Sequence, residues 1–518
     1  MQKTKIDLRD THSFSQFFLD YLQEKPELKP FYGLAPKIEN FEKQIANKEF
    51  DQAKRDTLCQ ALNAQYEPVE AKPAAQKNID LLAKPNTFTI TTGHQLNIFT
   101  GPLYFLYKII TVINAAKELS KKHPEYNFVP VYWMATEDHD FDEISFFNLF
   151  GKKYRWECEE KGGVGRYSTA GVRELLKELP ESVELFEKAY EKHENLADAV
   201  RCYVNDLFGE YGVVVVDGDS HELKAEFAAV IEDDLIANSA HGKVGEANAA
   251  LEELGYKTQI FPREINFFYL DHGVRERITK EGSKFKVLNT NLTFSESEIK
   301  DLIQRSPEKF SPNVVMRPLY QETILPNLAY IGGPAEIIYW LQLGKVFENY
   351  KTPFPILFPR NFALYINGGN QKKLDKFELT DEDLFKSGDD WQAEYLARHG
   401  QDEMNLNGEV NDLQKVFDHL IEKAEVVDSS LKGFIGAEHA KAVKSLENIE
   451  KRLKKSEERK HETALNQLAA IKEKLFPGGG LQERHDNFLN FYINNPNFVE
   501  GLVQNLDAFD LKMHVLRG

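Results

Sequence analysis

Cysteine is scarce in this 518-residue sequence, which contains Cys59, Cys158 and Cys202 and no others. They are far apart and form no CxxC pair, so the sequence predicts neither a disulfide framework nor a structural zinc site. Long apolar runs are also missing, because no stretch reaches the roughly 18 to 20 residues that span a bilayer. The amino terminus is polar and lacks a signal-peptide pattern. We therefore expect a cytoplasmic protein with no membrane partner.

Positive charge is in deficit, since 64 lysines and arginines stand against 82 aspartates and glutamates, a formal net charge of −18. Such a chain repels nucleic-acid phosphates, and no local basic groove is evident, so we expect no nucleic-acid partner. The 42% of hydrophobic residues and 12% of aromatic residues are typical of a folded protein. The length predicts about two to four domains.

The amino-terminal three quarters of the chain predict an α/β fold. β-Prone residues at 87–92 are followed by a glycine-bearing loop at 93–101, an amphipathic helix at 102–121 and an apolar strand at 128–134. This β–loop–α–β order is the unit of a doubly wound, Rossmann-like parallel sheet.

Further strands are predicted at 213–216, 328–331 and 355–358. The segments at about 150–205 and 235–310 are predicted insertions in this core, which extends over 1–375.

Residues 376–475 predict a helical coiled-coil domain. A first series of apolar residues has heptad spacing: Val410, Leu413, Phe417, Leu420, Ala424, Val427 and Leu431. A second series runs from 442 to 475, and Gly433 and Gly436 between them predict the turn of an antiparallel hairpin. Such an arm commonly binds a second copy, so we expect a homodimer. Residues 476–518 are predicted to return to the core.

The loop after the first strand is one candidate site. Ligands of open α/β sheets bind beyond the carboxyl ends of strands, where glycine lets a phosphate approach the backbone. The candidate binding residues are Thr92, Gly93, His94, Gln95, Asn97, Thr100 and Gly101. The alternative is a glycine-assisted turn whose polar groups satisfy one another, because the loop is neither GxGxxG nor a P-loop.

A crowded acidic turn follows the second strand and supplies the candidate catalytic residues, Glu137, Asp138, His139 and Asp140. Repulsion is expected to raise the carboxylate pKa values and to hold His139 as a cation. This suits the binding of an ammonium group, a proton transfer or a divalent cation, and the alternative is a solvated helix cap. No HxH or HExxH spacing is present, so we predict no tightly bound metal.

Later segments add further candidates. Arg317 is suited to clamp a carboxylate or phosphate, unless it pairs with Glu322 on a helix face. The other candidate binding residues are Asp217, Gln321, Gly332, Gly333, Glu336 and Arg360.

Together these motifs resemble one family, the cysteine ligases of bacillithiol biosynthesis, or BshC family. The resemblance rests on 92–95, 99–104, 137–143, 317–319, 328–334 and 477–484, and it covers nearly the whole chain. It implies a Rossmann-like core with two connecting insertions and a dimerising coiled coil. It also implies the last step of the pathway, in which the carboxyl group of cysteine is joined to the amine of glucosaminyl-malate.

Activation of that carboxylate is expected to use ATP, through a cysteinyl-adenylate or an acyl phosphate. We expect the first loop and Gly332-Gly333 to bind the nucleotide, and Glu137, Asp138 or Asp140 to bind the amine. The core is also similar to that of class I nucleotidyltransferases. The HIGH position is here Tyr104-Phe105-Leu106-Tyr107, without either histidine, and a KMSKS-like loop is missing. The family resemblance implies a hydrogen-bonding role for His94.

Two other functions fit the same residues. One is a non-catalytic, nucleotide-binding scaffold with a coiled coil. The other is a metal-dependent hydrolase that uses His94, Glu137 and His139.

Overall fold

The computed structural model describes residues 1–400 and 405–518, which divide into two compact units. The first consists of 1–365 and 480–516, and the second of 366–479 with 517–518. The sequence predicts a core that extends to residue 375, whereas in the structure the second unit begins at residue 366 and already includes helix α17 (Gly368–Lys376). Residues 401–404 of the predicted helical domain lie outside the described residues.

A five-stranded sheet in the order β13-β12-β2-β3-β6 is the centre of the first unit, and its neighbouring strands are all parallel. The strands are β2 (Thr87–His94), β3 (Asn127–Met134), β6 (Val214–Asp217), β12 (Asn327–Gly332) and β13 (Ile356–Pro359). The α/β class is confirmed. These strands are buried along almost their whole length, as is typical of parallel strands covered by helices.

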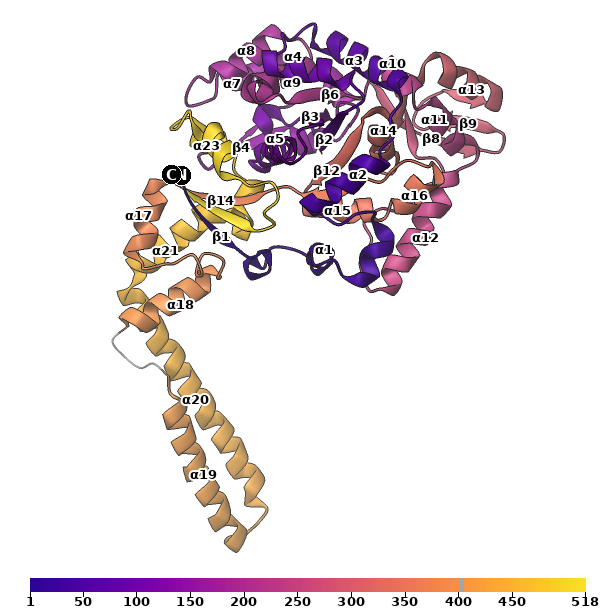
Figure 1. Ribbon diagram of the computed structural model, residues 1–518. Helices are drawn as coiled ribbons and strands as arrows, with labels where there is room; N and C mark the ends of the chain where they lie inside the picture. The colour runs from indigo at the N-terminus through magenta and orange to yellow at the C-terminus, as the bar shows by residue number, and fades with distance from the viewer. Residues whose placement is uncertain (401–404) are drawn as a thin grey trace. The chain divides into compact units, whose positions relative to one another are not determined.

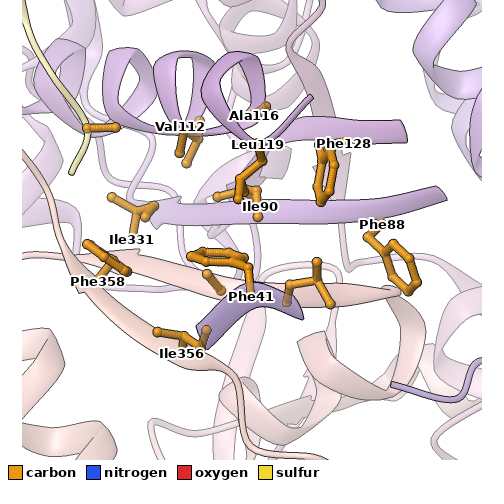
Figure 2. Close-up of a cluster of buried hydrophobic side chains, with 14 of the residues drawn as sticks. Phe41, Phe88, Ile90, Val112, Ala116, Leu119, Phe128, Ile331, Ile356 and Phe358 are labelled. Atoms are coloured by element: carbon orange, nitrogen blue, oxygen red, sulfur yellow. The ribbon is translucent and has the colours of Figure 1, made fainter. Parts of the chain in front are cut away.

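Helices α2 (Phe41–Asn47) and α5 (Tyr104–Lys122) contribute to the core beside this sheet. Figure 2 shows Phe41 beside Ile356 and Phe358, and Val112 and Leu119 above Ile90. All of these side chains are buried. The burial of these apolar side chains stabilises the sheet, so the polar groups at its edges are not needed to hold it together.

The first predicted insertion, at about 150–205, contains strand β5 (Lys152–Arg155) and helices α7 (Ala170–Leu176) and α8 (Glu184–Lys192) and most of α9 (Leu196–Phe208). Strand β4 (Phe146–Leu149), which pairs with β5 in a hairpin, precedes it. The second contains helix α12 (Ser239–Glu253), helix α13 (Glu296–Arg305) and an antiparallel sheet. That sheet has the order β10-β9-β8-β7-β11. Its strands are β7 (Phe267–Asp271), β8 (Val274–Glu281), β9 (Lys284–Val287), β10 (Thr293–Ser295) and β11 (Phe310–Pro312).

A third sheet joins both ends of the chain. Its order is β1-β15-β14, so the last strand (β15, Met513–Arg517) lies between the first (β1, Gln2–Ile6) and β14 (Phe362–Ile366).

The second unit contains the helical hairpin of α19 (Asn407–Val427) and α20 (Leu431–Lys460), drawn side by side in Figure 1. The predicted turn at Gly433 and Gly436 is wrong, because both glycines lie inside α20. The chain reverses at 428–430, where the Asp428 side chain accepts a hydrogen bond from the Ser430 amide. Helical glycine costs only about 1 kcal/mol relative to alanine, so the polar turn decides the reversal.

The heptad seam also shifts, since Leu420 is exposed and Ile421 is half-buried in its place. The second predicted helix is divided at His461, where α20 ends and α21 (Glu462–Leu475) begins. Among the described helices, none has the length and apolar character that crossing a membrane requires.

Candidate functional site

The carboxyl ends of the parallel strands bring the predicted segments to one edge of the core sheet. His94 ends β2 opposite Met134 of β3, which lies opposite Asp217 of β6. On the other side of β2, Gly332 ends β12 opposite Pro359 of β13. The loop after β2, the acidic turn after β3 and the glycine turn after β12 therefore share the edge where open α/β sheets bind ligands.

The loop after β2 has an unusual backbone. Phe99 and Thr100 have φ angles of 52° and 70°, and Gly101 has 62°. A Cβ atom on Gly101 would lie 2.5 Å from the Cβ of Asn97, so only glycine fits. Asn487 fixes this shape, because its amide Nδ2 donates to the carbonyls of Phe99 and Gly101 at 2.7 and 2.6 Å.

Several predicted donors of this loop have internal partners. The Thr92 hydroxyl donates to the Ile331 carbonyl at 2.8 Å, and the Asn97 amide donates to the Glu143 carbonyl at 2.9 Å. The Thr100 hydroxyl is buried without a hydrogen-bond partner among the described residues. We therefore interpret Thr92 and Asn97 as structural groups, because a hydrogen atom that is already donated within the protein is not available to a ligand. Thr92 joins β2 to β12, and Asn97 joins the loop after β2 to the acidic turn.

His94 lies in a largely aromatic environment, with its ring centre 5.4 Å from that of Tyr104 and 5.1 Å from that of Phe105. Burial lowers the pKa of His94 well below its ordinary value, and the charges of Lys108 and Arg360 lower it further. Its Nε2 atom is buried and has no partner within the described residues. A neutral ring of this kind is a hydrogen-bonding group rather than a cation.

Asp138 is the ionised acid of the site. Its Oδ2 accepts a hydrogen bond from the Gln95 side chain at 2.9 Å, and its Oδ1 accepts one from the His139 amide at 2.7 Å. Burial opposes ionisation, but the hydrogen bonds from His139 and Gln95 and the charge of Arg275 lower the pKa of Asp138 below its ordinary value. The predicted increase is therefore wrong for this carboxyl, because donors and a cation outweigh the neighbouring acids.

His139 lies between an acid and a cation, since its Nδ1 is 3.6 Å from Oδ1 of Asp138. Its Nδ1 lies 2.5 Å from Nη1 of Arg275, and a guanidinium can only donate. Nδ1 must therefore accept, which leaves the ring proton on Nε2. The side chain of Arg275 is 7% exposed, lies 4.1 Å from the centre of the Phe268 ring and donates to the Ser311 hydroxyl at 3.1 Å.

The other acidic candidates have different surroundings. Glu137 is buried and pairs with Lys224; burial raises the pKa of Glu137, and the charge of Lys224 opposes the increase. Asp140 is exposed at the start of a short helix. Asp217 accepts a hydrogen bond from the Thr136 hydroxyl, and burial raises its pKa. Glu137 and Asp217 therefore tie the edge together, and Asp138 is the acid that combines ionisation with partial exposure.

Arg317 is the cation of the site. Its guanidinium donates to the side-chain oxygen of Gln321 at 3.1 Å and to the Tyr339 hydroxyl at 3.3 Å. Within residues 1–400 and 405–518 it forms no ion pair with a carboxylate. A Cβ atom on Gly93 would lie 3.6 Å from Arg317 Nη1 and 3.2 Å from the Tyr330 hydroxyl, so the absence of a side chain lets the Gly93 backbone approach the guanidinium.

Glu322, the alternative partner of Arg317, pairs instead with Lys48 at 3.5 Å. Gln321 is fully buried, with its own amide donating to Glu322 at 2.9 Å. Gln321 therefore reaches a ligand only through Arg317.

Glu336 closes the glycine turn. It accepts hydrogen bonds from the Gly333 amide at 2.7 Å and the Tyr330 hydroxyl at 2.8 Å, and it pairs with Lys108 at 2.6 Å. Lys108 also donates to the Gly93 carbonyl at 2.7 Å. These bonds connect the turn after β12 to the loop after β2; Gly332 in this turn is buried, and its carbonyl accepts the Arg360 amide at 2.9 Å.

Arg360 is a structural residue, in contrast to its prediction as a binding residue. It is buried, and it forms an ion pair of 2.6 Å with the equally buried Glu483 and donates to the Asn361 carbonyl at 2.9 Å. Its charge is therefore already compensated.

Sequence reasoning missed the cations Lys108, Lys224 and Arg275 and the clamp Asn487. Each acts on a partner far away in the sequence, and no local spacing announces such a pair.

His94, Glu137 and His139 do not form a metal centre, because the described residues contain no cluster of three or more His, Cys, Asp or Glu side chains that could hold an ion. Two surface hollows of about 410 and 460 Å³ are lined by other residues, among them Lys72 and Asp206 in one and Ile113 and Phe128 in the other. Neither hollow includes the candidate residues at the carboxyl edge of the central sheet, so the candidate site is described by the contacts of its side chains and backbone.

Two domains of one protein family together match nearly the whole chain. Residues 1–361 match "Bacillithiol biosynthesis BshC, N-terminal Rossmann-like domain", and residues 363–517 match "Bacillithiol biosynthesis BshC, C-terminal coiled-coil domain".

Whole-length relatives agree with these matches. A protein of Cytophaga hutchinsonii is 43% identical over 98% of both chains, and one of Flavobacterium johnsoniae is 45% identical over 99% of both. A Bacillus anthracis protein is 27% identical over 96% of this chain and 97% of its own. All three are named "Putative cysteine ligase BshC". With both domains matched in order, this chain belongs to the BshC family.

Proposed function

We propose that this chain is a ligase that joins the carboxyl group of cysteine to the amine of glucosaminyl-malate, with ATP as the activating nucleotide. The names of the whole-length relatives support the reaction class. The observation that carries the proposal is the presence of two opposite, ionised groups at one sheet edge. Arg317 has no acidic partner among the described residues, and Asp138 is an ionised acid.

These groups suit the two halves of the reaction. Arg317 beside Gly93 fits an anion, which is a cysteine carboxylate or a nucleotide phosphate. Gly332 and Gly333 precede helix α15 (Pro334–Leu341), whose amino terminus favours an anion nearby. ATP supplies the activation that makes a carboxylate an acyl donor.

Asp138 fits the ammonium form of the acceptor amine. Because its pKa is lowered, it is a weak base and serves to bind and orient the amine. His139 directs its Nε2–H away from Arg275, which makes it a donor to a substrate oxygen. The two residues therefore position the acceptor, and its proton leaves to solvent.

The direct test is to incubate the protein with cysteine, glucosaminyl-malate and ATP, and to measure the thiol product and AMP or ADP by mass spectrometry. Asp138→Asn keeps the shape of the side chain and removes its charge, and we expect at least a 100-fold decrease in kcat/KM. The matched control is Asp142→Asn in the same turn, where an exposed carboxylate contacts Arg155 at 2.5 Å. Product formation that is equal in both variants, or missing in the unmodified protein, would contradict the proposal.

We also propose a homodimer formed through the helical hairpin. Its apolar residues Val416, Leu420, Ile449 and Leu453 are between 41% and 56% exposed. A second copy would bury such surface. We expect sedimentation equilibrium to give the dimer mass, and the double variant Leu420→Glu, Leu453→Glu to give the monomer mass; a monomeric unmodified protein would exclude this arm as the interface.

A further inference from the structure

A chain of buried hydrogen bonds leads from the central sheet to Arg317. On β2 the hydroxyls of Thr89 and Thr91 donate to the side-chain oxygen of Asn327, at 3.1 and 2.8 Å. The Asn327 amide donates to Glu322 at 2.6 Å, and Glu322 also accepts the Gln321 amide at 2.9 Å. Thr89, Thr91, Asn327, Gln321 and Glu322 are all buried.

The network fixes which end of Gln321 faces Arg317. The same Glu322 oxygen, Oε1, accepts from both Asn327 and Gln321. Arg317 can only donate, so Gln321 must direct its nitrogen to Glu322 and its oxygen to Arg317. This orientation holds in either protonation state of Glu322, because Oε1 acts as an acceptor in both.

In this network the group that orients Arg317 is not the group that carries the negative charge. The negative charge near Gln321 belongs to Glu322, where Lys48 lies 3.5 Å away to balance it. The group that touches Arg317 is a neutral amide at 3.1 Å. A carboxylate at this place would align the guanidinium equally well but would neutralise it.

We propose that Gln321 is a positioning residue that aligns Arg317 through a neutral acceptor and so keeps its positive charge available for the anionic group of a substrate. Arg317 and Gln321 lie one turn apart on helix α14 (Met316–Ile324), which places both side chains on one face. The inference rests on the proposed function only in assigning an anion to Arg317. The type of residue at position 321 then determines whether that anion binds to Arg317.

The decisive variant exchanges the two side chains, Gln321→Glu together with Glu322→Gln. The hydrogen bond between positions 321 and 322 is retained in reverse, while the carboxylate moves next to Arg317. The probes are L-cysteine, ATP and pyrophosphate, each titrated separately by calorimetry. We expect the unmodified protein to bind at least one of them, and the exchanged variant to bind that probe at least 30-fold more weakly.

The matched control is Gln342→Glu, another fully buried glutamine of the same unit. Its side-chain oxygen accepts the backbone amides of Gln259 and Ile260 at 2.9 and 3.2 Å, far along the chain from Arg317. This control introduces a buried carboxylate at a side chain that makes no hydrogen bond to Arg317, so affinity within 3-fold of the unmodified protein is expected. An exchanged variant that binds like the control, a control weakened as much as the exchanged variant, or an unmodified protein that binds none of the probes would overturn the proposal.

Gln321→Met provides a second measurement in case the exchanged variant does not fold, as judged by circular dichroism. It leaves Arg317 charged but unaligned, and we expect about 3- to 10-fold weaker probe binding, the effect of one hydrogen bond. Unchanged affinity in this variant would also refute the role of Gln321. Because binding is measured without turnover, retained binding with no thiol product would contradict the ligase reaction alone.

Discussion

Replacing Asn487 by alanine tests how the loop after β2 keeps its left-handed backbone. The Asn487 amide donates to the carbonyls of Phe99 and Gly101, and its side-chain oxygen accepts the Leu489 amide at 3.0 Å. The side chain is fully buried, so water does not replace these bonds without local opening. A buried carbonyl that loses its donor costs about 1–3 kcal/mol. For the two carbonyls we expect about 2 to 4 kcal/mol of local destabilisation.

Hydrogen–deuterium exchange of a peptide covering 97–106 measures this local stability directly. The expected loss corresponds to about 30- to 700-fold faster exchange, at about 1.4 kcal/mol for each factor of ten. The control is Asn490→Ala, whose amide donates to the Asn148 carbonyl at 2.9 Å and makes no bond to this loop. Exchange at 97–106 that changes by less than about 3-fold in Asn487→Ala, or equally in both variants, would refute the clamp.

Three further predictions concern other charged and titratable groups. Glu483→Gln leaves Arg360 as a buried charge without its partner, and we expect about 3 to 5 kcal/mol lower stability in denaturant unfolding; a loss below 1 kcal/mol would contradict this. Burial raises the pKa of Asp234 to about 6, so the folded state binds an extra proton. Its stabilising contribution is complete below the unfolded pKa near 4 and is lost as the pH rises through 6, about 3 kcal/mol in all; Asp234→Asn should flatten this part of the stability–pH curve, and an unchanged slope would assign it to other groups. In ¹⁵N-histidine spectra, His139 should carry its proton on Nε2, and Arg275→Met should allow the other tautomer; a proton on Nδ1 in the unmodified protein would exclude the assignment.

The fold class was predictable because the strands carry their own signal. The runs at 87–92, 128–134 and 213–216 are apolar or β-branched, and each corresponds to a strand of the parallel sheet. The helical hairpin was also predictable from its heptads, but not the position of its turn. There the polar residues at 428–430 outweigh two glycines, which a helix of 30 residues tolerates.

The candidate site was predictable only as far as local chemistry allows. The topology of a parallel sheet brings the turns after β2, β3 and β12 to one edge, whatever residues they contain. Which charges remain free depends on partners distant in sequence. Arg360 and Arg317 look alike in the sequence, and only the structure shows that Glu483 compensates the first. Ligand binding by the remaining residues of this edge stays a prediction.

The position of β15 between β1 and β14 has a consequence for how the chain matures. The first unit is interrupted by residues 366–479 of the second unit, so its segment 480–516 is synthesised after that interruption. That segment carries the counter-ion of Arg360 and the clamp of the loop after β2. A chain that stops at residue 479 thus contains all five central strands but lacks these two groups, and it also lacks Ala508, which packs in the core beside the sheet.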